Sequence, residues 1–270
     1  MASRLERLGS ELWETTSLLL VEDGEAVAVD PGVTPAEIER VRETADGFGA
    51  PVRTVLATHS HFDHVCGIGA FPDAEAVMGS TTAAVVRSGR AAADLASASA
   101  ELGLDYRGSL RCDRELEVGT AHRVGPFAVE TFGLLGHSAC GVAFRVRSLG
   151  LLVVGDHVSP AEFPFVYEST AAYRTTLAGL VDLLRRDPPE VVASGHGPLL
   201  DTAEALAVAE ADLEYLYELR RAVAAALPDG EQAAEAAGLA VDVPRPAAPD
   251  LVDESLRANV RSQIAELLAR

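Results

Sequence analysis

The chain has 270 residues, of which 48 % are apolar, and its formal net charge is −19. This length and apolar content predict a globular protein with one large domain, or one domain with a small appendage. The acidic balance disfavours a nucleic-acid-binding surface, which needs clustered Lys and Arg, and it would equally repel an anionic membrane. No segment looks like a secretory leader, and no apolar run approaches the roughly 20 residues of a membrane span. We therefore expect a cytoplasmic protein with no nucleic-acid or membrane partner.

The N-terminal part predicts two strands, 13–21 and 25–29, joined by an Asp-Gly turn that is typical of a hairpin. Thr34 and Glu37, with a proline between them, then match the start of a capped helix that runs to about residue 44. A β-branched run over 52–57 predicts the next strand. A strand, a helix and a strand in this order indicate a parallel pair within a mixed sheet.

The middle of the chain predicts a second group of short strands. Before this group, a short strand over 76–78 precedes an alanine-rich stretch, 81–102, which predicts one or two helices with a break at Gly89. The runs that follow are β-branched or alternating and are separated by Gly and Pro. They predict strands over 115–118, 127–132, 142–146, 151–154 and 191–193.

The C-terminal part has a helical pattern. Helices are predicted over 171–186 and 202–227, and the Pro-rich tract 243–249 predicts a stiff linker. A last helix is predicted from the spacing of Leu256, Val260, Ile264 and Leu267. We therefore expect a main domain, 1–200, and a C-terminal helical extension, 201–270, which could cap a pocket or pair with a second copy in a homodimer.

One short stretch carries most of the chemical information: H-x-H-x-D-H at residues 59–64, directly after the strand 52–57. With only seven histidines in the chain, this pattern has a low risk of arising by chance. His59 and His61 are two apart in extended chain, so their imidazoles point to the same side and one metal ion can take both. Asp63 and His64 follow at a predicted helix start, where consecutive side chains diverge by roughly 100° and can bind a second ion. Imidazole and carboxylate ligands suit zinc, iron or manganese rather than calcium.

Three further candidate ligands stand next to glycine at the ends of predicted strands. His137 lies in Gly-His-Ser, Asp156 in Gly-Asp-His and His196 in Gly-His-Gly. Glycine permits close approach of the backbone, and a strand end fixes a ligand on a rigid element. Of the two remaining histidines, we interpret His122 as a surface residue and His157 as part of the core or of the surroundings of the site.

The three cysteines, Cys66, Cys112 and Cys140, are an odd number without the spacing of a disulfide framework. We expect no disulfide bond, as in a reducing compartment. Cys66 and Cys140 fall within three residues of candidate ligands, so a thiolate role is conceivable. A small, buried apolar residue is nevertheless the commoner fate of a free cysteine.

Taken in chain order, these motifs, with Asp30 closing an early strand, resemble those of the metallo-β-lactamase-fold superfamily. The resemblance covers about residues 12–200. It implies an α/β fold, an αββα sandwich of two mixed β-sheets flanked by helices, with a metal site at one edge. It also implies two transition-metal ions, zinc first and iron or manganese as alternatives. The implied ligands are His59, His61 and His137 for one ion, Asp63, His64 and His196 for the other, and Asp156 as the bridge.

Within the superfamily, the bridging aspartate and the complete first motif are more similar to glyoxalase II and related thioester, ester and lactone hydrolases than to true β-lactamases. This similarity implies a small-molecule substrate and a metal-bridging water, whose pKa falls to about 7 on coordination, so that hydroxide attacks the substrate carbonyl. Asp63 would ligate a metal and orient that hydroxide, which makes it the catalytic candidate. The chain departs from the family pattern at Cys66, and at Ser159, where lactonases of acyl-homoserine signals usually carry tyrosine.

Substrate-binding residues are expected shortly after Asp156, although core packing is an equal alternative for each of them. Two other functions also stay open. A sulfur dioxygenase would hold a single iron with His59, His137 and Asp156. A non-catalytic, metal-containing effector protein would have its tail across the pocket. The expected aromatic wall and its one basic anchor comprise Phe163, Phe165, Tyr167, Tyr173 and Arg174.

Overall fold

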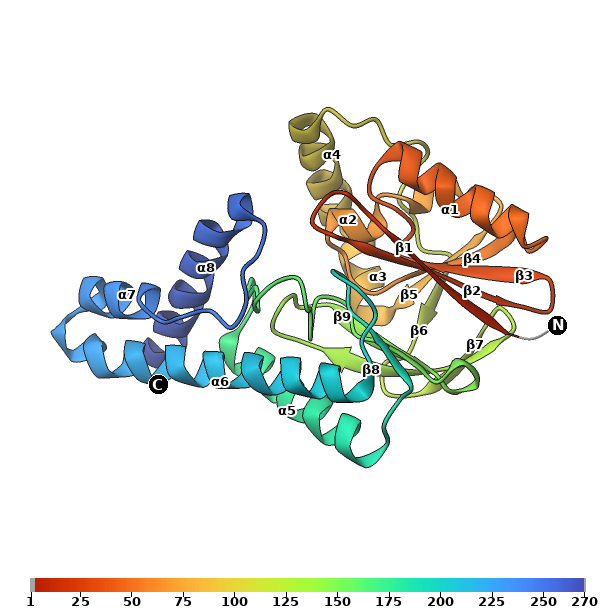
Figure 1. The fold of residues 1–270 in the computed structure, drawn as a ribbon. Helices are drawn as coiled ribbons and strands as arrows, with labels where there is room; N and C mark the ends of the chain where they lie inside the picture. The colour runs from red at the N-terminus through yellow and green to blue at the C-terminus, as the bar shows by residue number, and fades with distance from the viewer. Residues whose placement is uncertain (1–2, 270) are drawn as a thin grey trace.

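The computed structural model describes residues 3–269 and consists of two β-sheets packed face to face between layers of helices (Figure 1). The first sheet has six strands in the order β1-β2-β3-β4-β5-β6. Its first three strands are antiparallel, and β3 to β6 run parallel. The strands are β1 (Arg4–Gly9), β2 (Thr16–Glu22), β3 (Glu25–Val29), β4 (Val52–Ala57), β5 (Glu75–Gly79) and β6 (Arg114–Leu116).

The second sheet has five strands in the order β11-β10-β9-β8-β7. It is also mixed, because β10 and β11 run parallel while the other neighbours are antiparallel. The strands are β7 (Ala121–Val124), β8 (Phe127–Leu134), β9 (Gly141–Val146), β10 (Leu151–Val153) and β11 (Val191–Ala193).

An apolar core lies between the two sheets. Along β2, Leu18 and Leu20 belong to this core, whereas Leu19 between them packs in the helical layer on the other side. Phe127 and Phe144 contribute to the same core from the second sheet. Successive side chains of a strand point to opposite faces of its sheet. Apolar residues at successive positions therefore indicate that both faces of the sheet are buried. The predicted αββα sandwich of mixed sheets is confirmed.

Helices cover both outer faces of the sandwich. Those of the first half are α1 (Pro35–Gly47), α2 (Phe62–Val65), α3 (Ser80–Arg87) and α4 (Arg90–Leu102). Those of the second half are α5 (Thr170–Arg186), α6 (Thr202–Ala226), α7 (Glu231–Leu239) and α8 (Pro249–Leu268). Three short 3-10 turns span Ile68–Ala70, Arg147–Leu149 and Leu227–Asp229.

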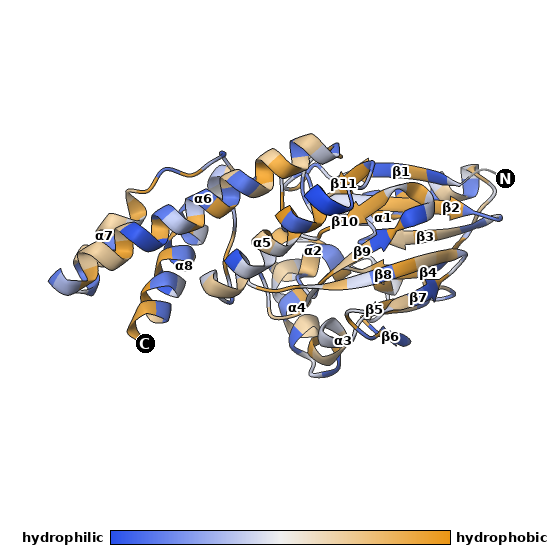
Figure 2. Cartoon of the chain, turned by 90° about the horizontal axis from the view of Figure 1, so that it is seen from below, coloured by the Kyte–Doolittle hydropathy of each residue, from blue (hydrophilic) through white to orange (hydrophobic). Residues whose placement is uncertain are grey.

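The last three helices reach beyond the sandwich, where α7 and α8 pack against α6 (Figure 1). Hydrophobic and hydrophilic residues alternate along these helices, as expected where one side of a helix is packed (Figure 2). None of the described helices is long and apolar enough to cross a membrane. The division of the chain at residue 200 stays a prediction.

Several predicted boundaries differ from the structure. The strand predicted from residue 13 begins only at Thr16, because Trp13 and Glu14 have φ values of 53° and 54°, outside the extended region. Strands β1 and β7 and helix α7 had no counterpart in the sequence prediction, and β6 ends before the predicted strand 115–118 does. The capping box of Thr34 and Glu37 is present as expected, and the break at Gly89 separates α3 from α4.

Candidate metal centre

The side chains of the first motif come from the end of β4 and the short helix behind it. His59 and His61 lie in the turn that follows Ala57, and His61 is the residue that precedes α2. Asp63 and His64 lie within α2, where the ring of His64 stays beside that of His59, with 4.2 Å between their centroids. The motif therefore supplies two separate pairs of ligands from six consecutive residues.

The other three candidates come from the second sheet. His137 follows β8, Asp156 follows β10 and His196 follows β11. All three are buried, with 3 %, 7 % and 5 % of their surface exposed. The strands of the two sheets therefore end at one common edge, where their polar residues meet.

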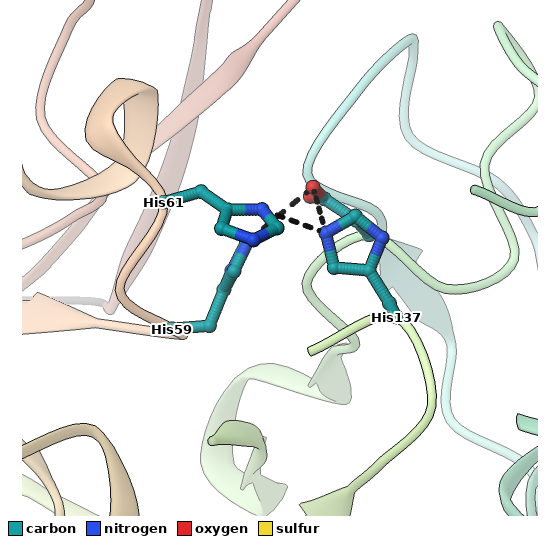
Figure 3. A group of neighbouring side chains, drawn as sticks. His59, His61 and His137 are labelled. Carbon is teal, nitrogen blue, oxygen red and sulfur yellow. Dashed lines mark hydrogen bonds and ion pairs between the residues drawn. The ribbon is translucent and has the colours of Figure 1, made fainter. Parts of the chain in front are cut away.

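One group of ligand atoms consists of three histidines and a carboxylate. Nε2 of His59 lies 3.3 Å from Oδ2 of Asp156, and Nε2 of His137 lies 3.1 Å from the same oxygen. Nδ1 of His61 is 2.9 Å from Nε2 of His137. Figure 3 shows the rings of His59, His61 and His137 pointing toward one another from two separate segments of the chain. Nitrogen and oxygen atoms gathered in this way could hold one metal ion.

A second group lies directly beside the first. Nε2 of His64 is 3.3 Å from Oδ2 of Asp63 and 3.1 Å from Oδ1 of Asp156. Nε2 of His196 is 3.6 Å from Oδ2 of Asp63 and 3.5 Å from Oδ2 of Asp156. Asp156 thus contacts histidines of both groups, as expected of a bridging ligand.

The outward-facing nitrogens of the histidines are held by the surrounding protein. Nδ1 of His64 donates to Oδ2 of Asp30 at 2.9 Å, Nδ1 of His137 to the carbonyl of Phe165 at 2.8 Å, and Nδ1 of His196 to the carbonyl of Trp13 at 2.9 Å. With Nδ1 protonated, the lone pair of Nε2 faces the centre. These bonds fix the tautomer and the ring orientation that metal binding requires.

The centre leaves polar atoms that only a further group can satisfy. Nε2 of His59, Nε2 of His64 and Oδ1 of Asp156 are buried, and their close contacts within the described chain do not have the geometry of a hydrogen bond. Buried polar atoms are normally paired, so these three point to an additional species between them. Transition-metal ions fit this donor set of imidazoles and carboxylates.

Packing around Asp156 explains the glycine that precedes His196. A Cβ atom at Gly195 would lie 2.0 Å from Oδ1 of Asp156 and 2.9 Å from Cε1 of His64. No other residue type could occupy this position without displacing the shared carboxylate. The Gly-His-Gly pattern therefore reflects close packing at the centre.

The charges of the metal-free centre oppose one another. Burial by itself would raise the pKa of Asp63 and of Asp156, but the neighbouring histidines, His64 first among them, together outweigh burial and lower both pKa values. Burial lowers the pKa of His59 and His61, so both imidazoles are neutral. Burial would also lower the pKa of His64 and of His196, but neighbouring carboxylates outweigh burial and raise both pKa values, so a metal ion would have to displace a proton from these two rings.

Sequence reasoning missed one acidic residue of the centre, Glu162. Oε1 of Glu162 lies 4.0 Å from Nε2 of His196, and with Asp156 these residues form a third group that could hold an ion. Its side chain is 7 % exposed. Burial raises its pKa to about 7. Glu162 lies in the irregular segment between β10 and α5, where no spacing pattern distinguishes it from a surface carboxylate.

A cavity of about 730 Å³ opens above the centre. Five of the predicted ligands line it, together with Glu162. Its walls come from the loop before β2, from α2 and α4, from the loop before α5, and from the first turns of α8. The remaining lining residues are Trp13, Phe62, Asp94, Ala98, Glu101, Leu102, Phe165, Tyr167, Leu251 and Glu254.

Two of the five expected substrate-binding residues, Phe165 and Tyr167, line this cavity, and the structure places the other three elsewhere. Phe163 is buried in the core beneath α6. Tyr173 is 1 % exposed and donates from its hydroxyl to the backbone carbonyl of Asp156 at 3.0 Å. Arg174 is not a free anchor, because it pairs with Glu266 of α8 at 2.8 Å. These three residues pack or bond inside the protein, as the core-packing alternative describes.

The remaining histidines and the cysteines lie outside the ligand groups. His122 is half-buried on β7 and lies 2.8 Å from the hydroxyl of Thr120. His157 is buried, and its ring packs on that of Tyr173 with 4.4 Å between centroids. The three cysteines are free, as expected, and the buried Cys66 donates to the carbonyl of Gly32 at 3.1 Å.

The αββα sandwich and the His- and Asp-rich edge define a candidate metalloprotein. The family profile described as "Metallo-beta-lactamase superfamily" matches residues 11–196. The chain therefore belongs to the metallo-beta-lactamase superfamily.

Individual relatives agree with this family. The chain is similar to "Probable metallo-hydrolase YqgX" of Bacillus subtilis (strain 168), with 27 % identity over 197 residues, which cover 70 % of this chain and 87 % of that protein. A metallo-beta-lactamase family protein from Thermus thermophilus superposes with a TM-score of 0.71 at 20 % identity, covering 99 % of this chain and 93 % of the other. The protein TTHA1623, in a di-iron-bound form, gives a TM-score of 0.56 at 23 % identity, covering 74 % and 96 %. The two structural likenesses show a shared fold.

Proposed function

We propose that the protein is a dinuclear metal-dependent hydrolase that cleaves a thioester, ester or lactone. The observation that carries this proposal is the pair of ligand groups that share Asp156 at the base of an open cavity. The relative from Bacillus subtilis, named as a probable metallo-hydrolase, supports the same reaction type.

When bound, two such ions supply an activated water as nucleophile and a Lewis acid for the substrate carbonyl. The chain then has three tasks. Asp156 holds the two ligand groups together, since its carboxylate contacts histidines of both. Asp63 lines the cavity, and its ionised carboxylate can accept a hydrogen bond from the attacking water and so orient it. Phe165 and Tyr167 would exclude bulk water from one side of the substrate.

The overall reaction adds one water across the acyl bond. A new carbon–oxygen bond forms, and the bond from the acyl carbon to sulfur or oxygen breaks. The departing thiol or alcohol takes one proton from the water, and the acid product keeps the hydroxyl group. No covalent bond to a protein side chain is required.

The first experiment is metal analysis of folded, metal-supplemented protein, combined with a panel of thioesters, esters and lactones. We expect close to two transition-metal ions per chain, zinc first and iron or manganese as alternatives. One ion at saturation would overturn the dinuclear hypothesis.

The variant His196→Ala separates the hydrolase from the sulfur dioxygenase. In a hydrolase the variant should lose or weaken one ion and hydrolyse thioesters at least about a hundredfold more slowly, the upper range for a disturbed ligand environment. If the parent instead consumes oxygen with a persulfide substrate and the variant keeps a single iron, the hydrolase proposal is wrong. If the metal-loaded parent turns over neither class, the protein is a metal-containing effector.

A further inference from the structure

The outer wall of the cavity is acidic. Asp94 and Glu101 lie on α4, and Glu254 lies on α8 (Figure 1 shows the two helices). No arginine is among the described residues that line the cavity, and the chain contains no lysine. A substrate entering the cavity therefore meets carboxylates on two opposing helices before it reaches the centre.

These three carboxylates are not neutralised by the protein. All three side chains are exposed, and none forms an ion pair with another residue of the described chain. Two arginines of the tail are engaged elsewhere: Arg245 pairs with Asp212, and Arg257 with Asp253 and Glu235. The negative charge of the wall is thus available to a ligand.

Bound metal ions would not reverse this charge. Two divalent ions bring four positive charges, of which the ligands Asp63 and Asp156 cancel two. The three outer carboxylates exceed the two charges that remain, even before Glu162 is counted. A cavity lined by one sign of charge concentrates ligands of the opposite sign.

A buried carboxylate also points into the cavity without a hydrogen-bond partner. The side chain of Glu162 is 7 % exposed, and the nearest charged group is His196, 4.0 Å away. None of the described residues donates a hydrogen bond to its carboxylate. Burying a carboxylate without a partner is costly, so Glu162 adds a negative charge at the base of the cavity that a cation, either an ion of the centre or a ligand in the cavity, would compensate.

Aromatic rings complete the wall. Trp13 and Phe62 meet edge to face with 5.7 Å between centroids, and Phe165 and Tyr167 do so at 6.4 Å. All four residues line the cavity. Aromatic faces combined with carboxylates form the environment that binds alkylammonium groups, because the faces of the rings attract a cation whose substituents are apolar.

We propose that the cavity selects substrates whose non-reacting part carries an alkylammonium group over substrates in which that part is anionic. This inference rests on the proposed hydrolase function and narrows its substrate class. Thioesters of acidic carriers and lactams with a carboxylate are negatively charged, so the carboxylates of the cavity wall would repel them. The substrate that the cavity would bind is an ester or a thioester that carries an alkylammonium group.

Three thioesters with the same acetyl group and side groups of similar size test the proposal. Acetylthiocholine is cationic, S-(3,3-dimethylbutyl) thioacetate is its neutral isostere, and S-acetyl-3-mercaptopropionate is anionic. With metal-loaded protein at low salt, we expect kcat/KM for the cation to exceed that for the anion at least tenfold. The ratio should fall as salt is added, since the outer carboxylates are exposed. An equal or faster reaction of the anion would overturn the proposal.

A matched pair of triple variants locates the effect. Asp94→Asn, Glu101→Gln and Glu254→Gln together should lower the cation-to-anion ratio severalfold. Glu43→Gln, Asp46→Asn and Glu218→Gln remove the same charge from exposed positions outside the cavity and should leave the ratio unchanged. Equal ratios in the two triple variants would contradict selection by this wall.

A binding measurement separates this inference from the hydrolase proposal. Trp13 is the only tryptophan of the chain and lines the cavity, so its fluorescence reports occupancy. Butyltrimethylammonium should change this fluorescence at lower concentration than the uncharged 3,3-dimethylbutanol, and the cavity variant should reduce the difference. If no thioester is cleaved but the ammonium ion binds in this way, only the hydrolase proposal fails. If the ammonium ion binds no better than the alcohol, the inference fails whatever the enzyme hydrolyses.

Discussion

The hydroxyl of Tyr173 donates to the backbone carbonyl of Asp156 across 3.0 Å, so the first turn of α5 holds the residue that both ligand groups share. The segment that carries His137 also approaches α5 closely, because Gly136, at φ 114°, leaves room for the backbone of Tyr173: a Cβ on Gly136 would lie 2.3 Å from that backbone. Tyr173 thus positions the candidate ligand Asp156 from the side of α5, although its sequence position suggests contact with substrate.

Tyr173→Phe should therefore weaken the centre without changing substrate recognition. The variant leaves a buried carbonyl without its donor, which costs about 1–3 kcal/mol. We expect a lower unfolding temperature and metal affinity reduced about tenfold, the lower range for loss of an outer-shell partner. Thermal unfolding and chelator competition measure both effects. A raised KM with unchanged metal affinity would contradict the positioning role and indicate that Tyr173 contacts the substrate.

Asp156→Ala should harm both metal sites, because the carboxylate contacts histidines of both groups. Two cations would then face each other with less negative charge between them. We expect elemental analysis to find less than one firmly bound ion per chain. His122→Ala, on β7, is the control and should bind as much metal as the parent. Equal metal content in the Asp156 variant and the parent would contradict the bridging role.

Glu162→Gln tests the carboxylate that sequence reasoning missed. The side chain belongs to a group with Asp156 and His196, so its charge should favour the ion on that side. We expect the weaker of the two ions to bind about tenfold less tightly, the lower range for a change in the ligand surroundings. Competition with a chelator measures this affinity. Glu168→Gln changes an exposed residue of the same loop and should leave the metal affinity unchanged. Equal metal affinity of the two variants would mean that Glu162 does not contribute to metal binding.

Glu37 should stabilise the fold only above acidic pH. Burial by itself would raise its pKa, but hydrogen bonds from Thr34, Glu11 and Ser10 outweigh burial and lower it. Because the folded pKa lies below the unfolded one, this stabilisation is present above the unfolded pKa and is lost as pH falls through the folded pKa.

Urea unfolding of Glu37→Gln at two pH values tests this. At pH 7 the free energy of unfolding should fall by about 1–3 kcal/mol, since donors lose a charged acceptor. At pH 3 the parent and the variant should differ less. Glu43→Gln, exposed on the same helix, serves as control. A difference that is as large at pH 3 as at pH 7 would mean that the charge of Glu37 contributes nothing.

Local pattern, with the family resemblance that it carries, was sufficient to predict the fold and to place the candidate ligands at the ends of strands. His59, Asp156 and His196 each follow a short apolar strand, and strand ends meet at one edge of a sandwich regardless of the loops between them. β1 was missed because its only large apolar residues, Leu5 and Leu8, are three positions apart and do not show the alternation of a half-buried strand.

Long-range contacts were beyond local pattern. Arg174 looks like a substrate anchor, but its partner Glu266 lies 92 residues further along the chain. The lining of the cavity by residues of α8 also depends on tertiary packing. Asn259 of α8 donates to the carbonyl of Pro164 at 2.7 Å and accepts from the amide of Val166 at 2.8 Å, on either side of the cavity residue Phe165. No spacing rule connects residues so far apart in sequence.

The placement of ligands on both sheets has a consequence for the lifetime of the protein. His59 and His64 follow the first sheet, while His137, Asp156 and His196 follow the second, so a bound ion ties the two halves of the sandwich together. A ligand that binds only the folded state at a thousand times its Kd stabilises that state by about 4 kcal/mol. Metal starvation would then increase the unfolded population that proteases degrade, and the abundance of the protein in the cell would follow the supply of metal.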